Sequence, residues 1–323
     1  MGKPLIAVAD SPFPNLNPAE AILSELDAEL VMADEPTVEG ILKVASEADG
    51  LMVTYGQITV DVIAGLEKCR VIGRFGLGVD NIDIEAATKA GIAVVYVPDY
   101  CIDEVSDHAM AMLLNLARKV SFSNSLVQAG RWEMPAVTPL SRLRGRTLGL
   151  AGFGQIPRVV APKAQAFGLK VIAFDPYIDK DVAAAFDVEL VDFETLLKLS
   201  DYVSIHVPMM PETENLFGAD AFAQMKPDAL LVNTARGPLV DTEALAKALD
   251  AGEIGGAALD VMPVEPPPAD SPLLGRDNII LSPHTAFYSV EALDELQTKT
   301  ARGVVDVLKG EKPVYPINPE VLE

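Results

Sequence analysis

Three polar residues in the C-terminal half of the chain have types that suit one reaction. Arg236, Glu265 and His284 each follow a short apolar run. Ligands of open parallel sheets bind at the carboxyl ends of the strands, so we expect these side chains to meet in one crevice. A guanidinium binds a carboxylate through paired hydrogen bonds, and an imidazolium favoured by a nearby carboxylate can donate a proton. The trio suits hydride transfer to a 2-keto acid, whereas a surface ion-pair cluster is the alternative.

A glycine turn upstream favours the first interpretation. Gly152 permits a tight turn after an apolar run, and Gly154 lets the backbone approach a pyrophosphate at the start of a helix. Pro157 stands at the third fingerprint position, where Gly or Ala is usual. Proline is tolerated in the first helical turn, but a fingerprint altered in this way is weak evidence when taken alone.

Asp175 strengthens the prediction of a dinucleotide site. It ends the next apolar run, about 20 residues after the glycines, where a carboxylate accepts hydrogen bonds from an adenosine ribose. The carboxylate would repel a 2′-phosphate, and the following Pro176 and Tyr177 offer no cation to neutralise one. We therefore expect NAD in preference to NADP. The alternative is an Asp-Pro pair that only forms a turn.

Further strand ends carry residues that can contact nicotinamide and ribose. His206 ends one apolar run and Thr234 follows another, although His206 can equally be a strand-end histidine with a purely structural hydrogen bond. His108 lies within a long helical stretch, so we interpret it as a core or interface residue. The predicted cofactor-binding residues are Gly152, Gly154, Gln155, Ile156, Asp175, His206, Val207, Pro208, Thr213, Thr234, Ala235, Arg236, Asp260 and His284.

A second glycine-containing turn, at residues 74–81, lies in the N-terminal third. Its exposed backbone N–H groups suit a carboxylate, although glycines there can also serve conformation alone. Apolar runs alternate with helical stretches from residue 5 to 97 and again from 147 to 282, which predicts an α/β fold with parallel sheets. One long helix is expected over 104–129 and a final one over 289–308.

Composition limits the partners. The chain has 323 residues, half of them hydrophobic, with 25 Lys and Arg against 47 Asp and Glu and a net charge of −22. This charge argues against nucleic acid or an anionic membrane; a solvated acidic surface explains it, and adaptation to high salt is the alternative. The two cysteines have no metal spacing, no metal is expected, and neither a signal-peptide pattern nor a spanning segment is apparent. We expect a cytoplasmic protein.

These motifs occur in the order typical of D-2-hydroxyacid dehydrogenases, and the chain resembles that family over nearly its whole length. Within the family it is most similar to the C-terminal-binding-protein and phosphoglycerate-dehydrogenase-like branches. The matching segments are 74–81, Gly152 and Gly154 with Asp175, 206–208, 233–237, Glu265-Pro266 and 282–284.

The resemblance implies two Rossmann-like domains with parallel sheets and the active site between them, usually in a homodimer. The substrate domain would be discontinuous, comprising 1–101 and 288–323, and 102–287 would bind NAD. His284 would be the general acid and base, Glu265 its partner, and Arg236 a ligand of the substrate. The substrate-binding residues would be Tyr55, Arg74, Leu77, Gly78, Arg236 and Phe287.

Departures from the family narrow the function. Thr54 and Tyr55 stand where phosphoglycerate enzymes place an arginine and a serine, which argues against a phosphate substrate. Glu265 beside His284 argues against the formate dehydrogenase branch, which uses glutamine, and Phe287 suits an apolar or extended substrate. We predict an NAD-dependent enzyme that interconverts a 2-keto acid and a D-2-hydroxy acid. An NADH-sensing interaction protein and an oxyanion dehydrogenase acting on a phosphite-like substrate are the alternatives.

Overall fold

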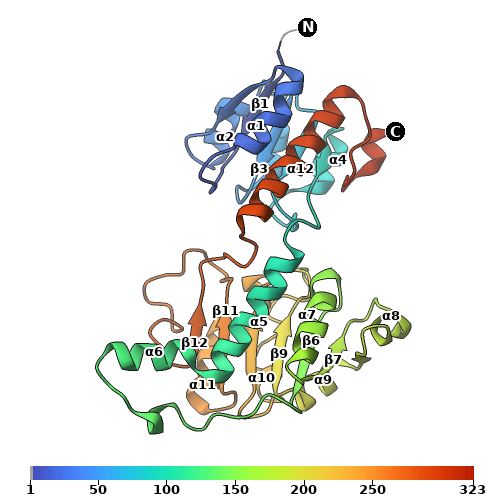
Figure 1. Ribbon diagram of the computed structural model, residues 1–323. Helices are drawn as coiled ribbons and strands as arrows, with labels where there is room; N and C mark the ends of the chain where they lie inside the picture. Colours follow the sequence, from blue (N-terminus) through green and yellow to red (C-terminus); the bar gives the residue numbers. More distant parts are fainter. Residues whose placement is uncertain (1–2) are drawn as a thin grey trace. The chain divides into compact units, whose positions relative to one another are not determined.

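The computed structural model describes residues 3–323, which form two compact units, each with its own parallel sheet (Figure 1). Unit 1 comprises the chain up to Tyr100 together with Ser289–Glu323, and unit 2 comprises Cys101–Tyr288. The sequence placed these divisions one residue away, after 101 and before 288. The expected fold class, α/β with two Rossmann-like sheets, is confirmed.

The sheet of unit 1 has five parallel strands in the order β2-β1-β3-β4-β5. Its chain order reverses between β1 and β3, and ligands of such sheets bind beside that point. The strands are β1 (Leu5–Val8), β2 (Glu29–Met32), β3 (Gly50–Val53), β4 (Val71–Arg74) and β5 (Ala93–Val95). The helices are α1 (Asn17–Leu23), α2 (Val38–Ala45), α3 (Val60–Ala64), α4 (Ile84–Lys89) and α12 (Val290–Lys309).

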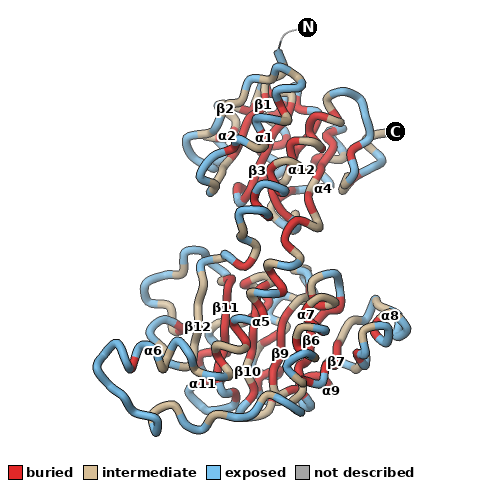
Figure 2. The backbone as a smooth tube through the Cα atoms, in the orientation of Figure 1, coloured by how far each residue is buried: buried red, intermediate tan, exposed pale blue. Residues whose placement is uncertain are grey.

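The central strands of unit 1 are apolar because both faces of the sheet are covered by helices. All four residues of β3 are buried, and the core runs along the strands in Figure 2. The last helix, α12, packs on β4 and α1 through a stripe that includes Leu293, Leu296 and Val304. With the buried Thr300 between the last two, the spacings of three and four residues keep one helix face inward. The C-terminal helix therefore belongs to the first unit, which makes that unit discontinuous.

The sheet of unit 2 has seven parallel strands in the order β12-β11-β10-β9-β6-β7-β8, and its reversal point lies between β6 and β9. The strands are β6 (Thr147–Ala151), β7 (Lys170–Phe174), β8 (Glu189–Leu190), β9 (Tyr202–Ile205), β10 (Leu230–Asn233), β11 (Gly256–Leu259) and β12 (Ile279–Leu281). The helices are α5 (Ile102–Arg118), α6 (Val120–Gln128), α7 (Gln155–Ala166), α8 (Lys180–Ala184), α9 (Phe193–Leu199), α10 (Ala219–Phe222) and α11 (Thr242–Ala251).

The expectation of one helix over 104–129 is wrong. The chain forms α5 and α6, separated at Lys119, whose backbone is left-handed with a φ of 52°. The Asn115 side chain accepts the Ser121 N–H at 2.8 Å and donates to its hydroxyl at 2.7 Å, which holds the break. Pro162 lies inside α7 and does not end that helix, which continues to Ala166.

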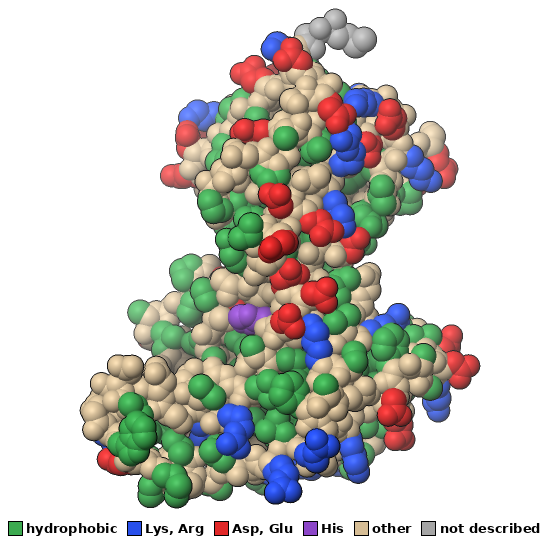
Figure 3. Space-filling model, viewed as in Figure 1, with side chains coloured by type: hydrophobic (Ala, Val, Ile, Leu, Met, Phe, Trp, Pro, Cys, Tyr) green, Lys and Arg blue, Asp and Glu red, His purple; other side chains and the backbone are tan. Residues whose placement is uncertain are grey.

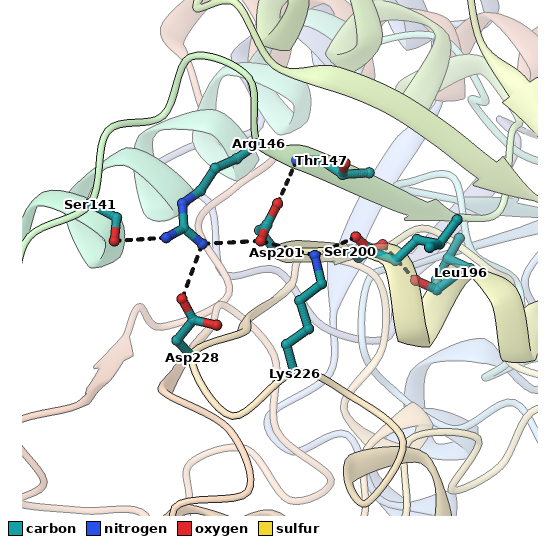
Figure 4. A network of polar contacts seen from close by, with 9 residues as sticks. Ser141, Arg146, Thr147, Leu196, Ser200, Asp201, Lys226 and Asp228 are labelled. Carbon is teal, nitrogen blue, oxygen red and sulfur yellow. Dashed lines mark hydrogen bonds and ion pairs between the residues drawn. The ribbon is translucent and has the colours of Figure 1, made fainter.

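A polar network joins the amino ends of β6 and β9, the strands that flank the reversal point (Figure 4). Asp201 accepts the Thr147 N–H at 2.7 Å and contacts both Arg146 and Lys226 at 3.0 Å. Burial alone would raise the pKa of Asp201, but the Thr147 N–H and the two cations hold that pKa below its ordinary value. The ionised carboxylate therefore ties together the strands that carry the site at their opposite ends.

Both acidic and basic side chains are visible on the face that Figure 3 presents. Among residues 3–323, no helix is long and apolar enough to cross a membrane. The same part of the chain contains no cluster of three or more His, Cys, Asp or Glu side chains suited to a metal ion.

Candidate active site in unit 2

The turn after β6 is shaped by close backbone packing. Gly152 has a φ of 99°, and a Cβ there would lie 2.8 Å from the carbonyl atoms of His206. Only glycine therefore fits between the ends of β6 and β9. At Gly154 an added Cβ would meet nothing within 4 Å, and α7 begins at the next residue. Open space at a helix N-terminus, with unsatisfied N–H groups, suits a pyrophosphate.

Asp175 directly follows β7 and lies beside this turn. One carboxylate oxygen accepts the Phe153 N–H at 2.9 Å and the other accepts the Tyr177 N–H at 2.9 Å. Each oxygen keeps a lone pair, so the side chain can fix the glycine turn and still bind a ribose hydroxyl.

The ends of β9 and β10 supply further polar groups. The Nε2 atom of His206 lies 2.8 Å from the Ser204 hydroxyl, and burial lowers the pKa of His206 to about 3, so its ring is neutral. Thr213 donates to the Pro208 carbonyl at 2.7 Å and fixes the loop after β9. The Oγ1 atom of Thr234 is buried and has no hydrogen-bond partner within the described chain. A buried hydroxyl without a partner is costly, and a bound ligand can satisfy it.

The residues around the reversal point between β6 and β9 therefore fit a nicotinamide dinucleotide. They combine an open glycine turn at Gly154, the Asp175 carboxylate and the partnerless hydroxyl of Thr234. When bound, the cofactor would supply or accept a hydride.

The loop after β10 holds Arg236 in place. The Asn233 side chain donates to the Arg236 carbonyl at 2.8 Å and accepts the Ala235 N–H at 3.0 Å. A Cβ on Gly237 would lie 2.0 Å from the Met262 carbonyl carbon, so the two backbones are in direct contact. This close approach brings the Arg236 loop against the loop that carries Glu265.

Glu265 and His284 form a hydrogen-bonded pair. His284 Nδ1 lies 2.7 Å from Glu265 Oε2, and Glu265 Oε1 accepts the Met262 N–H at 2.9 Å. Burial alone would raise the pKa of Glu265, but His284, the Met262 N–H and the charge of Arg236 hold it below its ordinary value. An ionised carboxylate only accepts hydrogen bonds, so Nδ1 of His284 carries a proton. The backbone of His284 is left-handed, with a φ of 53°, a conformation found at functional sites.

Asp260 anchors the loop that carries His284. Its carboxylate accepts the Thr285 and Ala286 N–H groups, each at 2.9 Å, and the Ser282 hydroxyl at 2.5 Å. Its carbonyl accepts the His284 N–H at 2.8 Å. The predicted contact of Asp260 with the cofactor stays a prediction. The centroid of the Phe287 ring lies 6.2 Å from the centroid of the His284 ring.

The substrate residues expected in the first domain lie on loops of unit 1. Tyr55 and Leu77 are partly exposed, and Arg74 ends β4 and donates to the Phe75 carbonyl. Gly78 lies in the same loop as Leu77. Unit 1 thus carries Tyr55, Arg74, Leu77 and Gly78, and unit 2 carries Arg236, Glu265, His284, Phe287 and the predicted cofactor residues.

Sequence reasoning missed Asp10. Its carboxylate accepts three successive backbone N–H groups of the loop after β3, from Thr54 at 2.9 Å, Tyr55 at 2.8 Å and Gly56 at 3.0 Å. Asp10 therefore fixes the loop that presents Tyr55. Its place two residues after β1, at the carboxyl edge of a predicted parallel sheet, is the signal that could have identified it.

Comparisons with known proteins agree with this geometry. Residues 110–286 match the family model described as D-isomer specific 2-hydroxyacid dehydrogenase, NAD binding domain, which confirms the expected cofactor. A D-3-phosphoglycerate dehydrogenase of Methanocaldococcus jannaschii is 42% identical over 90% of this chain and 55% of its own length. A glyoxylate reductase of Thermofilum pendens is 38% identical over 89% and 86%. The structure of D-lactate dehydrogenase from Aquifex aeolicus, complexed with NAD and lactic acid, is 26% identical, with a TM-score of 0.88 over 97% and 99%.

The chain spans about half the length of some of these relatives. It covers 55% of the M. jannaschii protein and 46% of a D-3-phosphoglycerate dehydrogenase from Arabidopsis thaliana.

Proposed function

Because the chain belongs to the D-isomer-specific 2-hydroxyacid dehydrogenase family, we propose that it is an NAD-dependent oxidoreductase that interconverts a 2-keto acid and a D-2-hydroxy acid. The observation that carries the proposal is the His284–Glu265 pair, 2.7 Å apart, next to Arg236 in the unit that holds the nucleotide turn. Hydride transfer to a keto acid needs a proton donor and a cation, and this arrangement supplies both.

His284 acts as the general acid in keto-acid reduction. Its Nδ1–H donates to the ionised Glu265, which orients the ring. The Nε2–H then donates its proton to the carbonyl oxygen as negative charge develops there. In hydroxy-acid oxidation the neutral Nε2 takes the hydroxyl proton.

Arg236 binds the substrate carboxylate through its guanidinium fork. We assign a second carboxylate contact to Arg74 and to the backbone N–H groups of Leu77 and Gly78. Tyr55 and Phe287 would contact the substrate side chain. Each of these roles can be tested by a separate KM measurement with the corresponding variant.

The charges of unit 1 favour a substrate without a phosphate. The loops that follow its five strands contain no Lys or Arg, and Arg74 is the last residue of β4. Asp10, Asp80 and Asp99 lie in the same loops, and Lys299 of α12 pairs with Asp99 at 2.8 Å. A phosphate dianion added to the carboxylate would therefore find no cation within these loops, and Lys299 is already paired with a carboxylate.

The acting form would be a homodimer in the cytoplasm. Large apolar side chains are exposed on α6 and the segment after it, including Trp132, which is 88% exposed, and Met134, at 73%. Exposed apolar groups concentrated in one segment suit a contact with a second copy. Light scattering would test it: Trp132→Asp with Met134→Asp should yield monomers, and an unchanged mass would contradict the assignment.

One experiment tests the proposed reaction. NADH consumption should be measured across glyoxylate, hydroxypyruvate, 3-phosphohydroxypyruvate, sulfopyruvate and branched-chain 2-keto acids. We expect turnover with at least one unphosphorylated member. NADH binding without turnover on any member would favour the NADH-sensing interaction protein, and NAD reduction by phosphite would favour the oxyanion dehydrogenase.

A further inference from the structure

His108 was expected to be a core or interface residue, but its ring contacts the loop that carries the catalytic histidine. It lies on α5, with a side chain that is 28% exposed, and its Nε2 atom is 3.0 Å from the Ser282 hydroxyl and 3.6 Å from Asp260 Oδ1. Ser282 directly follows β12, and Asp260 directly follows β11. The contact therefore joins one helix to the ends of two neighbouring strands.

The direction of these hydrogen bonds follows from proton counting. The Ser282 hydroxyl has one proton, which it donates to Asp260 Oδ1 at 2.5 Å. Toward His108 the hydroxyl oxygen can then only accept, so Nε2 of His108 carries a proton. The chain runs from the His108 Nε2–H to the Ser282 Oγ–H to a carboxylate that is 1% exposed. Hydrogen bonds that end on a buried charge polarise one another.

Asp260 connects the His108–Ser282 contact to the loop that carries His284. Its carboxylate holds the Thr285 and Ala286 N–H groups, and its carbonyl holds the His284 N–H, so three successive amides after Pro283 depend on it. His284 keeps a left-handed backbone at this point. Such a conformation persists only where the surrounding contacts determine it.

We propose that His108 is a positioning residue for the catalytic loop, acting through Ser282 and Asp260 on the placement of His284. The loss of its Nε2 donor should affect proton transfer more than cofactor or substrate binding. This effect on turnover rests on the proposed function.

Two substitutions at His108 separate the donor from the side-chain volume. Gln places an N–H donor where Nε2 lies, whereas Asn places its amide nearer to Nδ1. We expect His108→Asn to lower kcat about tenfold, with little change in the keto-acid KM or the NADH Kd. His108→Gln should keep most of kcat. Ser282→Ala should reproduce the loss, and the double variant Ser282→Ala with His108→Asn should be no slower than either single variant.

Asp107→Asn is the matched control, because Asp107 on the same helix pairs with Lys163 of α7 at 2.6 Å. Equal losses in the Asn and Gln variants of His108, an unchanged kcat in His108→Asn, or an equal loss in Asp107→Asn would overturn the proposal.

A second readout does not depend on turnover. Amide hydrogen exchange of Thr285 and Ala286 should be faster in His108→Asn than in His108→Gln or the unmodified protein. Unchanged protection in His108→Asn would contradict the positioning role even if no substrate were found. Faster exchange in a protein that reduces no keto acid would instead uphold the positioning chain and count against the proposed reaction.

Discussion

His284 Nδ1 lies 2.7 Å from Glu265 Oε2, and the other oxygen of that carboxylate accepts the Met262 N–H at 2.9 Å. One oxygen of Glu265 is thus held by a backbone amide, and the other contacts the imidazole. The pair fixes a proton on Nδ1, so in the proposed reaction proton transfer is assigned to Nε2.

Replacing Glu265 by Gln tests this pairing. Glutamine has one acceptor oxygen where glutamate has two, so it cannot accept both the His284 Nδ1–H and the Met262 N–H. We expect Glu265→Gln to lower kcat for keto-acid reduction by about tenfold or more, with little change in the NADH Kd. Steady-state kinetics of both proteins measure this loss, and an unchanged kcat would show that Glu265 does not position the imidazole.

The lowered pKa of Glu265 also makes a stability prediction. A carboxylate with a folded pKa below its ordinary 4.5 contributes stability above the unfolded value and loses it as the pH falls through the folded value. The contribution of Glu265 should therefore be fully present at neutral pH and decline as the pH falls below the unfolded value of 4.5. Thermal unfolding of Glu265→Gln and the unmodified protein at pH 7 and pH 3.5 should differ more at pH 7, and the opposite order would refute the assignment.

Asp201 should also stabilise the folded protein, with the same pH dependence as Glu265. We expect Asp201→Asn to lower the free energy of unfolding at pH 7 by about 1–3 kcal/mol, because a carboxylate shared by Thr147, Arg146 and Lys226 is lost. Its folded pKa lies below the ordinary 3.8, so the difference should shrink as acid protonates it. Urea unfolding measures the change. Asp228→Asn, whose side chain is 63% exposed, is the control and should cost less.

Asp175 should decide between the two nicotinamide dinucleotides. Its charge repels a 2′-phosphate, so we expect the protein to prefer NADH to NADPH. In Asp175→Ala the ratio of kcat/KM with NADH to kcat/KM with NADPH should fall by about tenfold or more. Asp175→Asn keeps an acceptor for the Phe153 N–H, 2.9 Å away in the structure, and separates the charge from the turn geometry. An unmodified protein that prefers NADPH would refute the specificity assignment.

The sheets were predictable because buried parallel strands are short apolar runs separated by helical patterns, as in β3 and β4. The proximity of Arg236, Glu265 and His284 was predictable because they follow such strands, and their roles in catalysis stay a prediction. The break at Lys119 was not, because a left-handed lysine is held by the side chains of Asn115 and Ser121. Asp10 and His108 were missed as loop anchors because their partners lie more than forty residues away in the chain, where no local pattern pairs them.

The central claim is that His284 is the acid and base of a keto-acid reductase. The most direct measurement compares His284→Gln with the unmodified protein for NADH binding by fluorescence and for reduction of the best keto acid of the panel. The account predicts an unchanged NADH Kd and a loss of turnover of about 10²–10⁴-fold. Undiminished keto-acid reduction by His284→Gln would contradict it.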